Sequence, residues 1–175
     1  SVGSNTLVRV QGGSTLSHHV ILDMTNTDLS LSGPLVKLET GSTVTALSGP
    51  AFKITGGSLA LSGANGFLIQ ADNSANHINR TGGNLDLTNT TVAATGIGQF
   101  GATDVTSVSL AAGDANFRLT NSSLTLTGTG ASLGGFGNTA SPTINGVQLI
   151  AADTTGPADH TITLEGSVLN LSNGP

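Results

Sequence analysis

Acidic side chains are the first residues in this sequence that could do chemistry, because enzymatic cleavage of a polysaccharide needs carboxylates. Glycoside hydrolysis uses two carboxylates placed across the scissile bond, and lyase chemistry uses acidic calcium ligands beside a basic residue. Asp28 and Asp86 each stand alone among Ser, Thr and Asn. Asp153 and Asp159 flank a Thr/Gly/Pro loop that is typical of a turn. We therefore predict no catalytic residues, and a polysaccharide-active lyase or hydrolase is the alternative.

The histidines are the next candidates, as ligands of a metal ion. His18 and His19 are adjacent, and adjacent residues on a strand point to opposite faces. His77 and His160 have no fixed spacing to this pair, whereas a zinc site needs three or four ligands in a defined geometry. We predict no metal site and no bound cofactor.

Calcium is considered separately, because the segment 82–87 is close to a calcium-binding nonapeptide repeat. That repeat requires glycine at its fourth position, which is Leu85 here, and no second copy follows. The sequence therefore disfavours calcium binding through this motif. A calcium site in a loop, with Asp104, Asp114 or Asp153 as a ligand, stays an open alternative.

The Thr-rich character of the chain raises the possibility of ice binding, which needs a regular array of Thr-x-Thr on successive coils. The tripeptides 43–45 and 125–127 fit, but they are out of phase with each other. Matching outward positions elsewhere hold Ser58 and Ala60. We expect the array to be broken, so Thr is explained by its β-propensity.

Four Asn-x-Ser/Thr sequons are present. They begin at Asn79, Asn89, Asn121 and Asn170. All four fall where corners between strands are expected, and Asn is favoured there because it tolerates turn geometry and can stack as a ladder of amides. The sequons are therefore interpreted as structural.

The elements that position these side chains are predicted by a short repeated unit. It reads apolar-x-apolar, a four-residue polar corner, Leu-x-Leu, then Ser/Thr and Gly or Asn. The unit is clearest in residues 52–63 and 117–128, and the same template fits residues 162–173. Two strands this short cannot bury an apolar face alone and leave both backbone edges unpaired.

Stacking of successive units would satisfy both the apolar side chains and the backbone edges. We therefore predict an all-β chain that folds as a single-stranded, right-handed parallel β-helix, which is a solenoid. Alternation along each strand places Leu59 and Leu61 inside and Ser58, Ala60 and Ser62 outside.

The spacing of corners predicts the length of one coil. The interval from Gly33-Pro34 to Gly49-Pro50 equals the interval from Leu38 to Ile54. Taken as one repeat, this interval predicts coils of about 16 to 22 residues and therefore about eight to ten coils. We expect residues 1–175 to form one β-helix domain, as a fragment or mature portion of a longer chain.

The template weakens in three places. Residues 78–89 match it, but Arg80 then takes a position that Ile54 and Leu119 fill elsewhere, so we predict an irregular coil there, because burial of a lone Arg is costly. Irregular, loop-bearing coils are also expected near 92–115 and 129–159. Strand-like pieces within these two stretches run from Val105 to Leu110 and from Val147 to Ile150.

Composition excludes several classes of function. The chain has no cysteine, so disulfides and thiolate chemistry are excluded. Five Lys and Arg residues are scattered in a chain of net charge −5, which argues against a nucleic-acid partner. No apolar run is long enough for a membrane-spanning helix, so we predict no membrane insertion within this segment.

The runs 54–63 and 119–128, which read ITGGSLALSG and LTNSSLTLTG, resemble the coils of bacterial surface-exposed β-helices. These are the filamentous-haemagglutinin-like exoproteins and the passenger domains of autotransporters. The resemblance implies an extracellular or cell-surface protein that mediates adhesion, aggregation or surface coating. It is specific for architecture, because many activities occur on the same scaffold.

We expect a non-enzymatic structural or adhesive β-helix whose partner is a host or neighbouring-cell surface, through a glycan or a protein. Unpaired strand edges at the first and last coils suggest an alternative. In that alternative the chain is a filament subunit that forms homo-oligomers by end-to-end or lateral stacking.

Overall fold

The chain is all-β wherever the structure describes it. The structure is a computed structural model that describes residues 6–100, 103–109, 115–127, 148–153 and 161–164, and these residues form strands and no helix. The strands belong to three parallel sheets, named A, B and C.

Sheet A contains β1 (Val8–Val10), β4 (Val36–Leu38), β7 (Phe67–Ala71) and β11 (Gly96–Gln99). Sheet B contains β2 (Thr15–His18), β5 (Thr43–Ala46), β8 (His77–Thr81) and β12 (Val105–Ser109). Sheet C contains β3 (Leu22–Leu31), β6 (Phe52–Leu61), β9 (Leu85–Thr88), β10 (Thr91–Ala94), β13 (Ala115–Thr120), β14 (Ser123–Leu126), β15 (Gln148–Asp153) and β16 (Thr161–Leu164).

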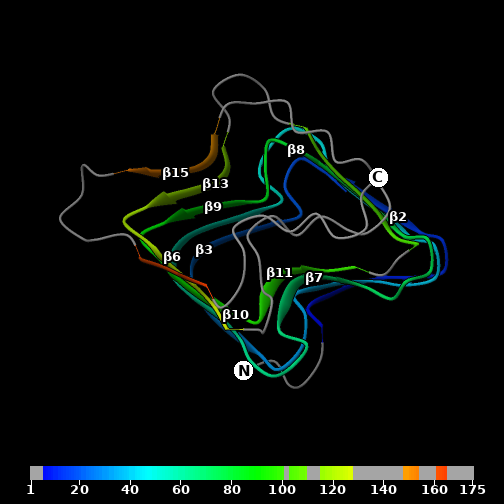
Figure 1. The fold of residues 1–175 in the computed structure, drawn as a ribbon, viewed down its shortest axis with the longest axis horizontal. Helices are drawn as coiled ribbons and strands as arrows, with labels where there is room; N and C mark the ends of the chain where they lie inside the picture. Colours follow the sequence, from blue (N-terminus) through cyan, green and yellow to red (C-terminus); the bar gives the residue numbers. More distant parts are fainter. Residues whose placement is uncertain (1–5, 101–102, 110–114, 128–147, 154–160, 165–175) are drawn as a thin grey trace.

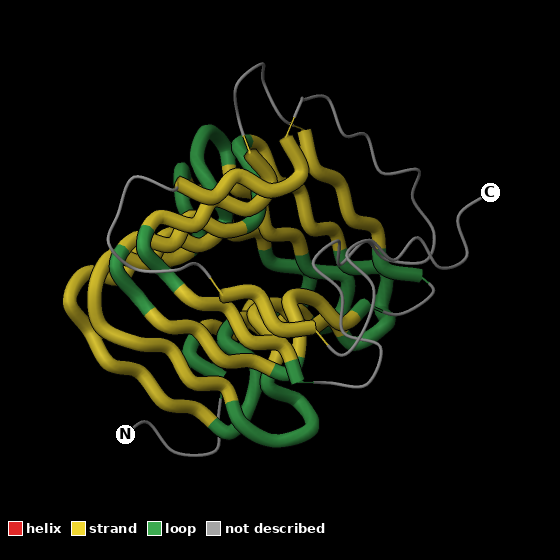
Figure 2. Tube along the Cα trace, turned by 60° about the vertical axis from the view of Figure 1, so that its left-hand side comes forward, coloured by secondary structure: helices red, strands yellow, loops and turns green. Residues whose placement is uncertain are grey.

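The three sheets surround one interior, and from β1 to β14 the chain passes repeatedly through sheet A, then sheet B, then sheet C (Figure 1). It runs through β1, β2 and β3, then through β4, β5 and β6. Each of the latter three strands pairs in parallel with the strand of the same sheet one coil earlier. Figure 2 shows the resulting stack from the side. The predicted parallel β-solenoid is confirmed.

The length of one coil differs from the sequence-based prediction. In sheet C, Leu22 pairs with Phe52, Phe52 with Leu85 and Leu85 with Phe117. Each of these steps is about twice the interval between Gly33 and Gly49. In sheet A, three steps of similar length lead from Val8 to Gly98. One coil is therefore about twice as long as predicted, and the expectation of eight to ten coils is wrong.

The error has a physical cause, which is the chemical similarity of the corners. Gly33-Pro34 precedes β4 in sheet A, and Gly49-Pro50 precedes β6 in sheet C of the same coil. Both corners need residues that turn the chain and expose polar groups, so the template does not distinguish them. The interval between them therefore separates two different corners of one coil, and not the same corner in two successive coils.

The repeated unit is one bent strand, or strand pair, of sheet C. β6 covers the whole unit, while β9 and β10 divide the next copy into two strands. A residue with positive φ lies at the bend in each of the four coils whose bend is described, and Asn or Gly fills this place because both tolerate the left-handed conformation. These residues are Asn26, Gly56, Gly57, Asn89 and Asn121.

Two proposed copies of the unit are misplaced in the template. In residues 78–89, the first half is β8 of sheet B and only the second half belongs to sheet C. The true copy runs from Leu85 to Ala94. Ile162 pairs with Leu124, which lies in the second half of the unit, so the copy at 162–173 does not begin there.

Aliphatic ladders fill the interior. Leu59 and Leu61 are buried, while Ser58, Ala60 and Ser62 retain contact with solvent, as predicted. Successive partners of Leu59 are also apolar, so each coil extends the same ladder. No helix that is long and apolar enough to cross a membrane occurs in the described part of the chain.

Arg80 is the main exception to the aliphatic interior, and its predicted place in an irregular coil is wrong. β8 keeps its register with β5 and β12, and Arg80 is 1% exposed. It aligns with Ala46, whose small side chain leaves space in the same column. Arg80 Nη1 donates to Asn84 Oδ1 at 2.6 Å, and the Phe100 ring lies 6.0 Å from the guanidinium carbon. Burial lowers the pKa of Arg80 to about 9, so the guanidinium is still charged at neutral pH.

The prediction of irregular, loop-bearing coils near 92–115 stays a prediction, because residues 101–102 and 110–114 lie outside the described part. Residues 92–94, 96–99 and 105–109 lie in β10, β11 and β12, each in register with the coil before. The strand-like piece predicted from Val105 is β12, and the piece predicted near Ile150 is β15. Residues 101–102, 110–114, 128–147 and 154–160 lie outside the described part.

Candidate functional site

Asp28 and Asp86, two of the acidic residues considered for catalysis, are not brought together. Asp28 lies on β3, where its Oδ1 atom accepts a hydrogen bond from Ser58 Oγ at 2.7 Å. Asp86 lies on β9, on the other side of the bend in sheet C. Asp153 ends β15, and Asp159 lies outside the described residues. Asp28 and Asp86 thus lie in different halves of sheet C and do not form a pair.

The adjacent histidines contact each other and their own chain. Their rings lie 6.0 Å apart in an edge-on arrangement. His18 Nδ1 lies 3.1 Å from the carbonyl oxygen of Val20, and His19 Nδ1 lies 2.6 Å from Ser48 Oγ. Within the described ranges no group of three or more His, Cys, Asp or Glu residues could hold a metal ion. His77 lies on β8, and His160 is outside those ranges.

Asp104, one of the calcium candidates, is instead part of a buried polar ladder between sheets A and B. Its carboxylate accepts hydrogen bonds from the backbone N–H groups of Asn73 and Asn76, each at 3.0 Å, and from Asn76 Nδ2 at 2.9 Å. Asn76 Oδ1 accepts in turn from the backbone N–H of Ser42 at 2.9 Å. The ladder links three coils through the backbone of a corner. Asp114 lies outside the described residues.

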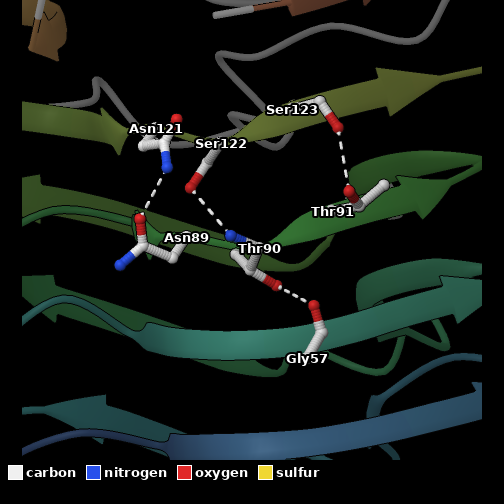
Figure 3. Close-up of a pocket in the computed structure, with 7 residues that line it drawn as sticks. All are labelled: Gly57, Asn89, Thr90, Thr91, Asn121, Ser122 and Ser123. Atoms are coloured by element: carbon white, nitrogen blue, oxygen red, sulfur yellow. Dashed lines mark hydrogen bonds between the residues drawn. The ribbon is translucent and has the colours of Figure 1, made fainter. Parts of the chain in front are cut away.

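A polar groove lies at the bend of sheet C, and Figure 3 shows the residues that line it. Its volume is about 350 Å³, and Asn, Ser and Thr side chains from two coils form most of its wall. Gly57 lies at its floor with φ of 70°, and a Cβ atom there would lie 2.3 Å from the carbonyl oxygen of Thr27. A side chain at residue 57 would therefore clash with the backbone of the preceding coil.

Hydrogen bonds between coils occupy much of this groove (Figure 3). Asn121 Nδ2 donates to Asn89 Oδ1 at 2.8 Å, and Thr90 Oγ1 donates to the Gly57 carbonyl at 2.9 Å. Two sequons thus stack directly on each other, and the predicted amide ladder is confirmed at this corner. The lining residues include no acid, base or activated nucleophile. The groove can therefore offer amide and hydroxyl groups to a neutral polar group.

The outward face of sheet C breaks the Thr array that ice binding would need. Thr125 aligns with Ala93, then with Ala60 and finally with Ser30. The Thr-x-Thr tripeptide at 43–45 lies on β5 in sheet B, which is a different face. The predicted interruption of the array is confirmed over these four coils.

A column of alternating charge crosses the first half of sheet C. Asp23, Lys53, Asp86 and Arg118 are successive register partners, and Lys53 Nζ lies 3.9 Å from Asp23 Oδ2. Burial raises the pKa of Asp86, and the charges of Arg118 and Lys53 oppose this rise. The burial cost thus exceeds the attraction of the two cations. We name this set the sheet C column.

A second column of side chains, the sheet A column, crosses the outward face of sheet A. Its members are Arg9, Lys37, Gln70 and Gln99, in successive register. Glu39 lies beside the two cations, where Oε2 accepts from Arg9 and Oε1 lies 2.7 Å from Lys37 Nζ. The hydrogen bonds from Arg9 and then Lys37 lower the pKa of Glu39. Sequence reasoning missed both columns, because successive members are a whole coil apart in the chain.

Comparison of the chain with family models, with curated proteins and with solved structures finds no match. The resemblance of its coils to those of bacterial surface β-helices therefore rests on the repeated unit alone.

Proposed function

We propose that this chain is a non-enzymatic structural or adhesive β-solenoid of a bacterial surface or secreted protein. The main support is the use made of its polar side chains. Several described polar side chains at the corners hydrogen-bond from one coil to the next, among them Asn121 with Asn89, Thr90 with Gly57 and Asp104 with Asn76. Such a scaffold presents long, regular faces, which suit contact with a host or neighbouring cell.

Bead adhesion tests this proposal. Beads coated with the folded chain should be retained on bacterial or epithelial cells more strongly than beads coated with Gly57→Val. This substitution places a side chain against the Thr27 backbone and should disrupt coil stacking. Equal retention of both bead types would contradict the proposal. Release of new reducing ends or unsaturated products from pectic and other acidic glycans would favour the polysaccharide-active alternative instead.

A second candidate function is a filament subunit that assembles end to end, and one observation favours it. Among the described residues, β1, β2 and β3 each pair on one side only. Their apolar side chains Leu16 and Leu22 are partly exposed, whereas their stacked partners Val44 and Phe52 are at most 1% exposed. A further coil placed on this edge would bury the exposed ends of these ladders.

Electron microscopy and sedimentation separate the two candidates. Long uniform fibres that vanish in a Leu22→Lys variant would support the filament. Short monodisperse particles at every concentration would contradict it and leave the adhesive scaffold. Thr25→Lys is a matched control, because Thr25 lies on the same strand but is exposed on its outward side.

A further inference from the structure

We propose that the outward face of sheet A carries a binding groove for a carboxylate-bearing oligosaccharide, such as a chain of uronic acids. The groove has a volume of about 460 Å³, and its polar lining residues include Arg9, Lys37, Gln70, Asn65 and Ser32, beside Gly33 and Pro34. This inference goes beyond the proposed function, because a soluble oligosaccharide would bind there whether or not the chain holds cells together.

The local charge of this groove is opposite to that of the whole chain. The chain carries a net charge of −5 and has five Lys and Arg residues, two of which line this groove. Arg80 is buried, while Lys53 and Arg118 belong to the alternating sheet C column. Arg9 and Lys37 are thus adjacent cations at neighbouring rungs of one outward column. Such a pair in an acidic protein attracts an anion.

Glu39 does not satisfy the two cations completely. It is one carboxylate for two positive charges, and it is not among the residues that line the groove. Its contacts use Nε and Nη2 of Arg9 and one N–H bond of Lys37. Arg9 Nη1 and the remaining N–H bonds of Lys37 take no part in these contacts, and both side chains face the groove. Glu39 therefore positions the two cations for a second carboxylate.

Three of the other lining residues carry groups that can contact the hydroxyl groups of a sugar. Gln70 and Asn65 contribute amides, with Gln70 Nε2 lying 3.4 Å from Asn65 Oδ1, and Ser32 contributes a hydroxyl. Gln70 Nε2 lies 2.5 Å from Gln99 Oε1, so the column of hydrogen-bonding groups continues beyond the two cations. Successive rungs are spaced by about 4.8 Å, as in any β-sheet. An extended chain with repeated acidic and hydroxyl groups can therefore contact several rungs at once.

Calorimetric titration of the full chain with an oligogalacturonide of defined length tests this proposal. The same oligosaccharide with methyl-esterified carboxyl groups is the matched neutral ligand. We expect binding of the acidic ligand only, with an affinity that falls as salt is added. Arg9→Gln and Lys37→Gln should each weaken binding about tenfold, because each removes a charge-assisted hydrogen bond. Lys53→Gln makes the same change of charge on sheet C and should alter the affinity less than about twofold.

Three outcomes would overturn the assignment. The first is no detectable binding of the acidic ligand, and the second is equal binding of its methyl ester. The third is an equal loss of affinity in Lys53→Gln, which would mean that the overall field of the protein acts rather than this groove. Dextran sulfate is titrated as a second anionic ligand. If it bound as tightly as the oligogalacturonide, the preference for carboxylate would be overturned. Thermal unfolding checks that Arg9→Gln and Lys37→Gln remain folded, and Arg9→Lys should restore part of the binding.

Discussion

The sheet C column and the sheet A column occupy comparable outward positions, but their charges are arranged differently. In sheet C, acid and base alternate from Asp23 to Arg118, so each inner member has an opposite charge above and below. In sheet A, Arg9 and Lys37 are neighbours, and the acid that moderates them lies to one side. The first column is balanced within itself, whereas the second keeps donors for another molecule.

This difference separates two uses of charge on one scaffold. The pKa of Asp86 is raised, so its burial outweighs the attraction of its neighbours, and the sheet C column adds little net stability. Its benefit lies in register, because a strand shifted by one residue would place Lys53 opposite Leu22 or Met24 instead of opposite Asp23. The sheet A column accepts adjacent like charges, which a purely structural column would avoid. Such a departure from the local rule is expected at a functional site.

The largest effect is expected from Asp86→Lys, which would place three cations on successive rungs of the sheet C column. Two attractive neighbours would become repulsive, so the free energy of unfolding should fall by about 1–2 kcal/mol. Urea denaturation measures this change. Asp86→Asn is the control, and it should change stability by less than about 0.5 kcal/mol because the neutral form is tolerated at this half-buried position. Equal losses in both variants would show that the alternation of charge is irrelevant.

Much of the fold could be predicted from the sequence, because the information is local. The alternation at Leu59 and Leu61 identifies inward and outward residues, and the polar corners identify the bends. Coil length could not be predicted, because the corner at Gly33-Pro34 resembles the corner at Gly49-Pro50. The site could not be predicted for the same reason. Lys37 and Gln70 become neighbours only when the coil length is known.

Arg80 shows a second limit of sequence reasoning. Burial of a lone cation is costly, so the sequence favoured an irregular coil. The cost is reduced by Asn84, which follows in the next corner, and by the ring of Phe100. The small side chain of Ala46 provides space one coil away. These three contributions come from different parts of the chain, so no local pattern reveals them.

Acid titration should separate the two columns by the sign of its effect. Glu39 has a pKa below its ordinary value of 4.5, so its contribution to stability is present above about pH 4.5 and is lost as the pH falls through the folded value. Asp86 has a pKa above its ordinary value of 3.8, so the folded state binds the proton first. Its contribution rises as the pH falls from the folded value to about 3.8.

Urea unfolding between neutral pH and about pH 3 measures both contributions. Glu39→Gln should remove the loss of stability that Glu39 causes as the pH falls. Asp86→Asn should remove the gain of stability that Asp86 causes as the pH falls. Each difference should be below about 1 kcal/mol, because both carboxyl groups partly face water. If both substitutions changed the pH dependence of the free energy of unfolding in the same direction, the distinction between the columns would be contradicted.

The smallest effect on stability is expected from Gln70→Glu, which would make the sheet A column resemble the sheet C column. The new carboxylate lies one rung from Lys37 and should stabilise the fold by about 0.2–1 kcal/mol. It should also compete for the donors that face the groove, so the affinity for the uronate ligand should fall. Gln99→Glu is the matched control, because it adds the same charge two rungs from Lys37. If the two variants lost affinity equally, overall charge would explain the effect, and the adjacency of Arg9 and Lys37 would have no special role. A loss of affinity in Gln70→Glu but not in Gln99→Glu would show that one acidic residue next to Lys37 is enough to turn a ligand-binding column into a self-balanced one.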